Sequence, residues 1–132
     1  DAPLDVDDTA ARALGQWFNF GFEVLEELRG YGVEEDDVTP VQLWPEHFDP
    51  ATELGNQDLG RRASYGASPG DSGHQTPYVY VSVWGEIESS PYWNAPSFRG
   101  SLLGYRDLMA ADDPTRTAVD FLLWGYRLLH SA

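Results

Sequence analysis

Apolar residues recur at helical intervals near both ends of the chain. In the first third, one face of a helix is marked by Leu14, Trp17, Phe18, Gly21, Phe22, Leu25 and Leu28. Asp8 or Thr9 can cap such a helix at its start, and Gly30 is a natural stop. The pattern predicts an amphipathic helix that follows an extended acidic lead-in and faces the core. The alternative is that its aromatic residues form the wall of a ligand site.

The last twenty residues carry a second helical pattern. Asp113 and Pro114 are a typical helix start, with the aspartate at the cap and the proline at the first position. Arg116 and Asp120 can pair one turn apart. The apolar stripe that follows consists of Ala118, Phe121, Leu122, Gly125, Leu128 and Leu129. We expect this helix to close the fold.

Residues 78–84 alternate between two kinds of side chain, which is the period of a strand. Valines occupy one set of positions, and Tyr78, Tyr80, Ser82 and Trp84 occupy the other. Both kinds are good strand formers. The pattern predicts a strand with its valines in the core and its aromatic residues on the second face of the sheet.

Other stretches give weaker strand signals. Residues 39–49 are expected to form one kinked strand, with Pro45 at an edge or a bulge because proline cannot donate to a ladder. We expect residues 50–60 to be irregular, with a helical turn at 51–54, residues 61–65 to form a second strand and residues 101–103 the last.

Three glycine-, proline- and acid-rich stretches are expected outside the sheet. The acids of residues 34–37 suggest a solvated turn. Residues 66–77 and 85–97 read as loops, and residues 105–110 as one helical turn.

The order of these elements predicts an α+β fold. It would consist of a small, mostly antiparallel sheet of three to four strands, bracketed by an N-terminal and a C-terminal helix. Residues 1–132 suit a single domain. Because so small a sheet is unusual for this length, we expect another segment or chain to complete it, as a homo-oligomer or as the C-terminal portion of a longer protein.

Charge narrows the range of partners. The formal net charge is -14, and all basic side chains are arginines. Such a surface repels phosphate backbones and anionic membranes, so nucleic acid and membrane are excluded as partners. No apolar run approaches the length of a membrane span, and the chain has no cysteine. A small molecule or another protein remains as the expected partner, and the cytoplasm is the favoured compartment.

Two histidines and two aspartates form one candidate site. His47 and Asp49 lie two apart on the predicted kinked strand, and Asp71 and His74 lie in the following loop. Imidazole and carboxylate suit zinc, iron or manganese, so these four residues could hold a divalent metal in a hydrolase-like enzyme. His47 and Asp49 could also act as a catalytic acid–base pair without metal. The plainer alternative is that His47 anchors backbone carbonyls near the bulge, that His74 is a solvated loop residue and that His130 favours a helix end.

Aromatic residues form a second candidate site. Trp44, Tyr78, Tyr80 and Trp84 could line a shallow platform suited to sugars, apolar ligands or a protein partner. The alternative is that these rings form a second core layer. The sequence favours a domain that binds a ligand or a protein through this aromatic face, with a metal-dependent enzyme as the second hypothesis.

Several segments occur together in an order that is typical of one protein family. They are the stretch from Val41 to Ala51 with its Phe-Asp pair, the Tyr-Gly-x-x-Pro-Gly loop at residues 65–70, and the Pro-Tyr-x-Tyr strand at residues 77–80. With Tyr92-Trp93, residues 98–105 and residues 111–114, this order resembles a family of mainly actinobacterial proteins catalogued as a domain of unknown function. The resemblance covers about residues 39–130 and implies further β-rich sequence upstream. It implies no activity.

Overall fold

The computed structural model describes residues 2–44 and 49–131. Within these residues the fold is α+β, as predicted, and five strands form one antiparallel sheet in sequence order, where three to four were expected. The strands are β1 (Gln42–Trp44), β2 (Asp49–Leu54), β3 (Ala63–Ser68), β4 (Tyr78–Val83) and β5 (Gly100–Gly104). Each strand pairs antiparallel with the next, so the sheet requires no crossover connection.

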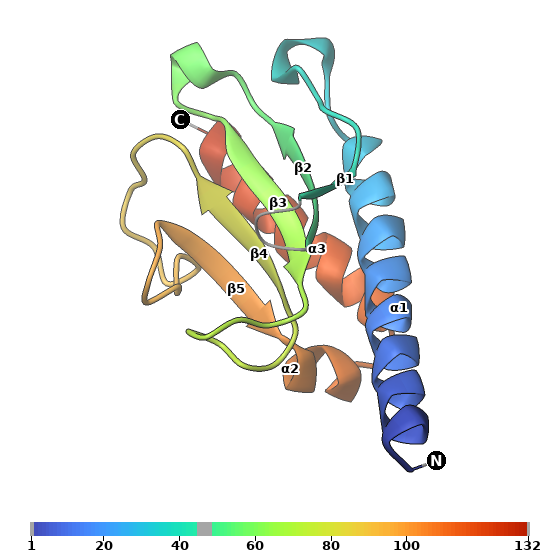
Figure 1. Ribbon diagram of the computed structural model, residues 1–132. Helices are drawn as coiled ribbons and strands as arrows, with labels where there is room; N and C mark the ends of the chain where they lie inside the picture. The colour runs from blue at the N-terminus through green and yellow to red at the C-terminus, as the bar shows by residue number, and fades with distance from the viewer. Residues whose placement is uncertain (1, 45–48, 132) are drawn as a thin grey trace.

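The longer helices cover one face of this sheet (Figure 1). α1 (Ala2–Arg29) runs beside the β1–β3 half, and α3 (Pro114–His130) lies behind the sheet. The short α2 (Tyr105–Ala110) follows β5 directly, and two turns of 3-10 helix, η1 (Glu34–Asp36) and η2 (Gln57–Leu59), lie in the connections. The opposite face of the sheet, turned toward the viewer in Figure 1, is left without a helix among the described residues.

The core lies between the helices and the sheet. The valines of β4 are buried there, as their alternation predicted, together with Val24, Leu25 and Leu28 of α1 and Val119, Leu122 and Leu123 of α3. Gly21 lets α1 lie close to the sheet, because a methyl group at this position would collide with the Cβ of Ala67 in β3. The predicted start of α3 is confirmed, since the Asp113 carboxylate accepts the Arg116 amide at 3.1 Å.

The first helix begins earlier than the sequence pattern indicated. The acidic lead-in is helical from Ala2 onward. Pro3 fits within the first turn, where its missing N–H has no partner to lose. The helix therefore extends into a stretch that lacks an apolar stripe.

The predicted kinked strand over residues 39–49 is wrong. β1 ends at Trp44, and Asp49 begins β2, which turns back to pair antiparallel with β1. The helical turn expected at residues 51–54 is also wrong, because these residues belong to β2. Central pairing explains the difference: β2 bonds to β3 along its length, from Ala51 opposite Gly66 to Leu54 opposite Ala63. Such pairing outweighs weak local preferences.

The β5 edge of the sheet is covered by the chain itself. The Asn94 side chain donates to the Leu102 carbonyl at 3.2 Å and accepts the Leu102 amide at 2.9 Å, so it imitates the backbone of a further strand. The Ala95 amide also donates to the Gly100 carbonyl at 3.1 Å. An edge whose backbone groups are already bonded is a poor template for another chain.

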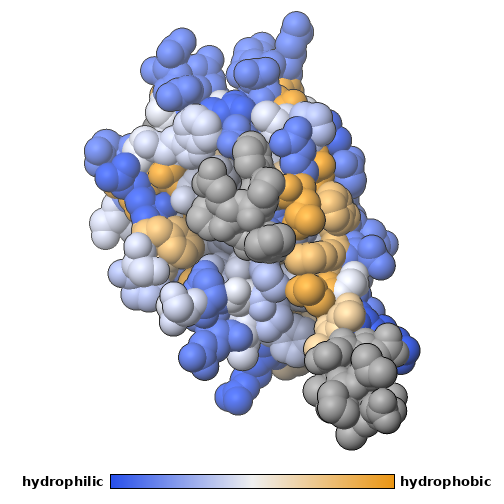
Figure 2. All heavy atoms as spheres, viewed as in Figure 1, coloured by the Kyte–Doolittle hydropathy of each residue, from blue (hydrophilic) through white to orange (hydrophobic). Residues whose placement is uncertain are grey.

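The surface in Figure 2 has separate apolar and polar regions. Apolar side chains gather over α1 and beside β1, while pale and blue side chains make up most of the coloured remainder of this face. Leu14 and Leu43 are among the exposed large apolar residues of α1 and β1. Across the part of the chain that the structure describes, no helix combines the length and hydrophobicity required to cross a bilayer.

Candidate functional site

The open face of the sheet is hollowed at its centre. Strand register places Ser64, Gly66 and Ser68 of β3 opposite Ser82, Tyr80 and Tyr78 of β4 on this face. A run of such small residues on the third strand leaves space above it. The resulting cavity has a volume of about 430 Å³ and is lined by Asp49, Ser64, Ser68, Asp71, Tyr78, Tyr80, Ser82 and Phe98.

Tyr80 lies across the floor of this cavity. Its ring passes over Gly66, where a methyl group would collide with both the ring and the hydroxyl. The Tyr80 hydroxyl donates a hydrogen bond to Oδ2 of Asp49 at the start of β2. Asp49 is only 3% exposed. Burial, and then the Asp49 charge, raise the pKa of Tyr80 far above its ordinary value, so the hydroxyl remains a donor at all ordinary pH values.

Tyr78 makes the corresponding contact at the loop side of the cavity. Its hydroxyl donates to Oδ2 of Asp71 at 2.8 Å, while Oδ1 of Asp71 accepts the amides of Gly73 and His74, each at 2.8 Å. The hydrogen bond from Tyr78 is the main cause that lowers the pKa of Asp71. Burial and the bond to Asp71 raise the pKa of Tyr78 to about 12. Asp71 is therefore a carboxylate, and Tyr78 a phenol, at neutral pH.

The predicted metal ligands are brought together only in part. His47 lies outside the described residues. Asp49 and Asp71 both line the cavity, but the His74 ring packs edge-on against Tyr78 at 4.8 Å and its Nδ1 lies 2.9 Å from the Thr76 carbonyl oxygen. Within residues 2–44 and 49–131, no three His, Cys, Asp or Glu side chains are placed to hold a metal ion. The His74 side chain therefore contacts its own loop and Tyr78, and these contacts stabilise the loop.

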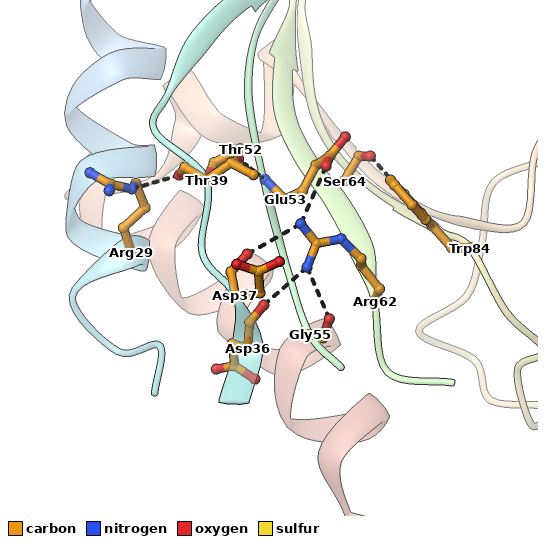
Figure 3. A network of polar contacts seen from close by, with 10 residues as sticks. All are labelled: Arg29, Asp36, Asp37, Thr39, Thr52, Glu53, Gly55, Arg62, Ser64 and Trp84. Atoms are coloured by element: carbon orange, nitrogen blue, oxygen red, sulfur yellow. Dashed lines mark hydrogen bonds and ion pairs between the residues drawn. The ribbon is translucent and has the colours of Figure 1, made fainter. Parts of the chain in front are cut away.

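Only some of the aromatic residues predicted to form a platform line the cavity. Tyr78 and Tyr80 line the cavity. Trp84 follows β4 outside that lining, where its indole donates to the Ser64 hydroxyl at 3.0 Å and its ring lies 5.4 Å from the Arg62 guanidinium (Figure 3). Trp44 lies in β1 opposite Asp49, and its side chain is outside the described set.

Arg62 is a structural cation. Figure 3 shows its guanidinium between the η1 turn and the end of β2, where Nη1 donates to the carbonyl of Asp36 at 3.0 Å and to that of Gly55 at 3.1 Å. Nη2 donates to the Asp37 carbonyl and to the Glu53 carboxylate at 3.2 and 3.3 Å. Since Arg62 is 7% exposed and both terminal nitrogens of its guanidinium donate hydrogen bonds within the fold, Arg62 serves the fold and does not line the cavity.

The solvated turn expected at residues 34–37 is confirmed for Glu34, Glu35 and Asp37, which are exposed, but not for Asp36. Asp36 is 2% exposed and accepts hydrogen bonds from the Tyr126 hydroxyl at 2.5 Å and the Val33 amide at 2.9 Å. Nε2 of His130 lies 3.0 Å from its other oxygen. Burial raises the pKa of Asp36, but these bonds outweigh it and hold the pKa below its ordinary value. The sequence therefore placed His130 correctly at a helix end but missed its bonding partner.

A second hollow lies beside α1. It has a volume of about 560 Å³ and its walls include Trp17, Phe20, Tyr105 and Met109. The described residues that line it carry no charge. Part of the aromatic stripe of α1 therefore borders a cavity, in addition to its packing against the core.

The sequence analysis did not assign four of the cavity residues to a site. The position of Ser82 could have been predicted, because Ser82 shares the alternation of Tyr78 and Tyr80. The positions of the other three could not. Ser64 and Ser68 lie in β3, whose register depends on pairing with β4. Phe98 comes from the loop before β5, and its place at the cavity follows from tertiary folding.

Comparison of the chain with models of protein families, with curated proteins and with solved structures gives no match.

Proposed function

We propose that this protein is a small-molecule binding module whose site is the cavity on the open sheet face. The observation that carries the proposal is the composition of that cavity: hydroxyl groups from three serines and two tyrosines, two carboxylates and a phenyl ring face one space of about 430 Å³. Binding sites for small ligands combine apolar contact surface with a few fixed polar groups.

Preorganisation of the polar groups supports the same conclusion. Both tyrosine hydroxyls are held by carboxylates, and Asp71 is held in turn by two backbone amides. Groups fixed before binding lose little conformational entropy when a ligand arrives.

The test is a ligand screen with a variant that fills the cavity. Ser82 lines the cavity from the centre of β4, so Ser82→Trp places an indole in the space a ligand would occupy. Ser89→Trp is the matched control, because Ser89 is exposed and does not line the cavity. Both variants and the unmodified protein would be screened against a library of small polar compounds by saturation-transfer NMR.

We expect compounds that bind the unmodified protein and Ser89→Trp and fail to bind Ser82→Trp. The melting temperature of Ser82→Trp checks that its fold persists. If the library yields no binder, or if every binder also binds a folded Ser82→Trp, the cavity is not a ligand site.

A further inference from the structure

The hollow beside α1 is bounded by three segments of the chain. α1 forms one wall, α2 lies beside it at the same end of the molecule (Figure 1), and the loop between β3 and β4 contributes Pro69 and Pro77. Its volume of about 560 Å³ is within the range of small-molecule sites, roughly 300–1,000 Å³. Among the described residues, none lines both this hollow and the cavity on the open sheet face. The hollow therefore has the size of a separate ligand site.

Aromatic rings form much of its wall. The Trp17 ring stacks on Phe20 of the same helix with centroids 5.3 Å apart, and it meets the Tyr105 ring of α2 edge to face at 6.0 Å. Leu14 and Met109, each 43% exposed, add apolar side chains at the border. Rings and aliphatic chains of this kind offer a ligand a large apolar contact area. A cyclic apolar ligand would bury surface that now faces solvent.

Hydrogen bonds hold the walls in place. The Tyr105 amide donates to the Pro77 carbonyl at 2.8 Å, which ties the start of α2 to the end of the loop. At the other end of the loop, the amide of Gly70, the residue after Pro69, donates to the Ser68 hydroxyl at 3.1 Å. The proline rings also restrict the backbone on both sides of the loop. Walls that are fixed before binding lose little conformational entropy when a ligand arrives.

The polar groups of the hollow carry no charge. Its lining, as far as the structure describes it, includes neither an acid nor a base. Trp17 is only 6% exposed, and its Nε1 has no hydrogen-bond acceptor in the described part of the chain. A buried donor without an acceptor costs free energy. A ligand that turns the indole slightly and offers an acceptor oxygen removes this cost, whereas a charged ligand would lose its hydration without gaining a partner of opposite charge in the lining.

Taken together, size, apolar rings and the absence of charge in the described lining define a ligand class. We infer that the hollow between α1 and α2 binds small uncharged ring compounds, aromatic or alicyclic, that carry an acceptor oxygen. This inference goes beyond the proposed function, because it assigns a second site with a different ligand class. The recessed shape between three segments favours a small molecule over a second copy of the chain, and the experiment distinguishes the two.

The experiment uses probes that share a ring system and differ in charge. The three are 2-acetylnaphthalene, which is uncharged, 2-naphthoate, which is anionic, and 2-(aminomethyl)naphthalene, which is cationic at neutral pH. Each is titrated into the unmodified protein at an ionic strength of about 0.15 M, which screens the acidic surface. The indole N–H signal of Trp17 is followed by NMR. We expect the ketone to shift this signal and to bind about tenfold or more tightly than either charged compound.

Two tryptophan substitutions on α1 test the location of the site. Ala13 lines the hollow, so Ala13→Trp places an indole in it, and the affinity for the ketone should fall by about tenfold or more. Ala11→Trp is the matched control, because Ala11 is also an exposed alanine of α1 but does not line the hollow. The melting temperature checks that both variants fold. Met109→Glu, which puts a charge at the border of the hollow, should weaken binding likewise and replaces Ala13→Trp if that variant unfolds.

Several outcomes would overturn the inference. It is wrong if none of the three compounds binds, if a charged compound binds as tightly as the ketone, or if the folded variant at residue 13 or 109 binds the ketone as well as Ala11→Trp does. Analytical ultracentrifugation tests the other occupant. We expect a monomer; a concentration-dependent dimer that persists in Ala11→Trp and is lost in Ala13→Trp would assign the hollow to a second copy of the chain and refute the inference.

Discussion

Tyrosine–aspartate pairs occur in two settings in this protein. In the closed setting, Asp36 is enclosed between η1 and α3, and Tyr126, His130 and the Val33 amide surround its oxygens. In the open setting, Tyr78 and Asp71 form the same kind of bond at the rim of a cavity. The chemistry of the bond is shared, but access differs, and the Asp36 carboxylate also has an imidazole nitrogen of His130 3.0 Å away.

That difference separates structural carboxylates from carboxylates that can meet a ligand. A buried carboxylate is tolerated when its lone pairs are occupied, and Asp36 meets this condition with partners from two distant segments. Asp71 has comparable bonding, yet it is exposed and has space beside it. The closed pair ties α3 to the sheet connections. The open pair leaves its charge facing the cavity.

The largest effect is expected from breaking the closed pair. Asp36→Asn removes a buried charge from three partners, so we expect the free energy of unfolding to fall by about 3 kcal/mol. Asp37→Asn is the control: Asp37 is exposed and has a left-handed backbone that asparagine tolerates, so its effect should stay within about 0.5 kcal/mol. Urea unfolding measures both. Equal effects would show that Asp36 is not a structural centre.

A change beneath Tyr80, on the floor of the cavity, should have the next largest effect. Gly66→Ala brings a methyl group against the Tyr80 ring and hydroxyl, so Tyr80 must move away from Asp49, at a cost of about 2 kcal/mol. The NMR signals of Tyr80 should shift while those of Tyr126 stay in place.

Gly15→Ala is the matched control for this substitution. Gly15 lies in α1 with open space around it, so alanine should stabilise the protein by up to about 1 kcal/mol. If Gly66→Ala is as well tolerated as Gly15→Ala, Tyr80 does not depend on the absence of a side chain at residue 66.

Removing a single hydroxyl sharpens the comparison. Tyr126→Phe leaves the buried Asp36 short of one donor, and we expect a loss of about 1.5 kcal/mol. Tyr78→Phe should cost about 0.5 kcal/mol, because water can replace the phenol at the exposed Asp71. Urea unfolding of the two variants gives the difference. A greater loss for Tyr78→Phe would reverse the assignment of the closed and open pairs.

The smallest expected effect is on how the free energy of unfolding depends on pH in acid. The pKa of Asp36 is lower in the folded protein than in the unfolded chain, so its stabilisation is present above the unfolded value of about 4 and is lost as the pH falls through the folded value. The free energy of unfolding should therefore decrease on acidification below about pH 4. Asp36→Asn should flatten this decrease when unfolding is followed against pH. Asp71→Asn should change it less, because water screens the exposed Asp71. An unchanged slope in Asp36→Asn would contradict the role of this carboxylate.

Local signals account for the parts of the fold that the sequence predicted. The stripe of α1, the cap at Asp113 and the alternation of β4 all depend on residues within a few positions of one another. The sequence did not predict β2, because Pro50 and Glu53 have low intrinsic preferences for strands. Pairing with β1 and β3 stabilises the strand in spite of these residues. The candidate site was predicted in part for the same reason: Tyr78 and Tyr80 share a face by alternation, whereas Phe98 and Asp49 reach the cavity through tertiary contacts.

The sequence by itself determined the α+β class, the core face of β4, the acidic surface and the aromatic character of the second sheet face. The tertiary structure decided which acids are enclosed and which line a cavity. The physical reason is distance along the chain. Periodicity sets the direction of a side chain from its neighbours, but the environment of a carboxylate depends on partners such as His130, which lies 94 positions beyond Asp36. The same residue type therefore holds the fold at Asp36 and faces the open cavity at Asp71.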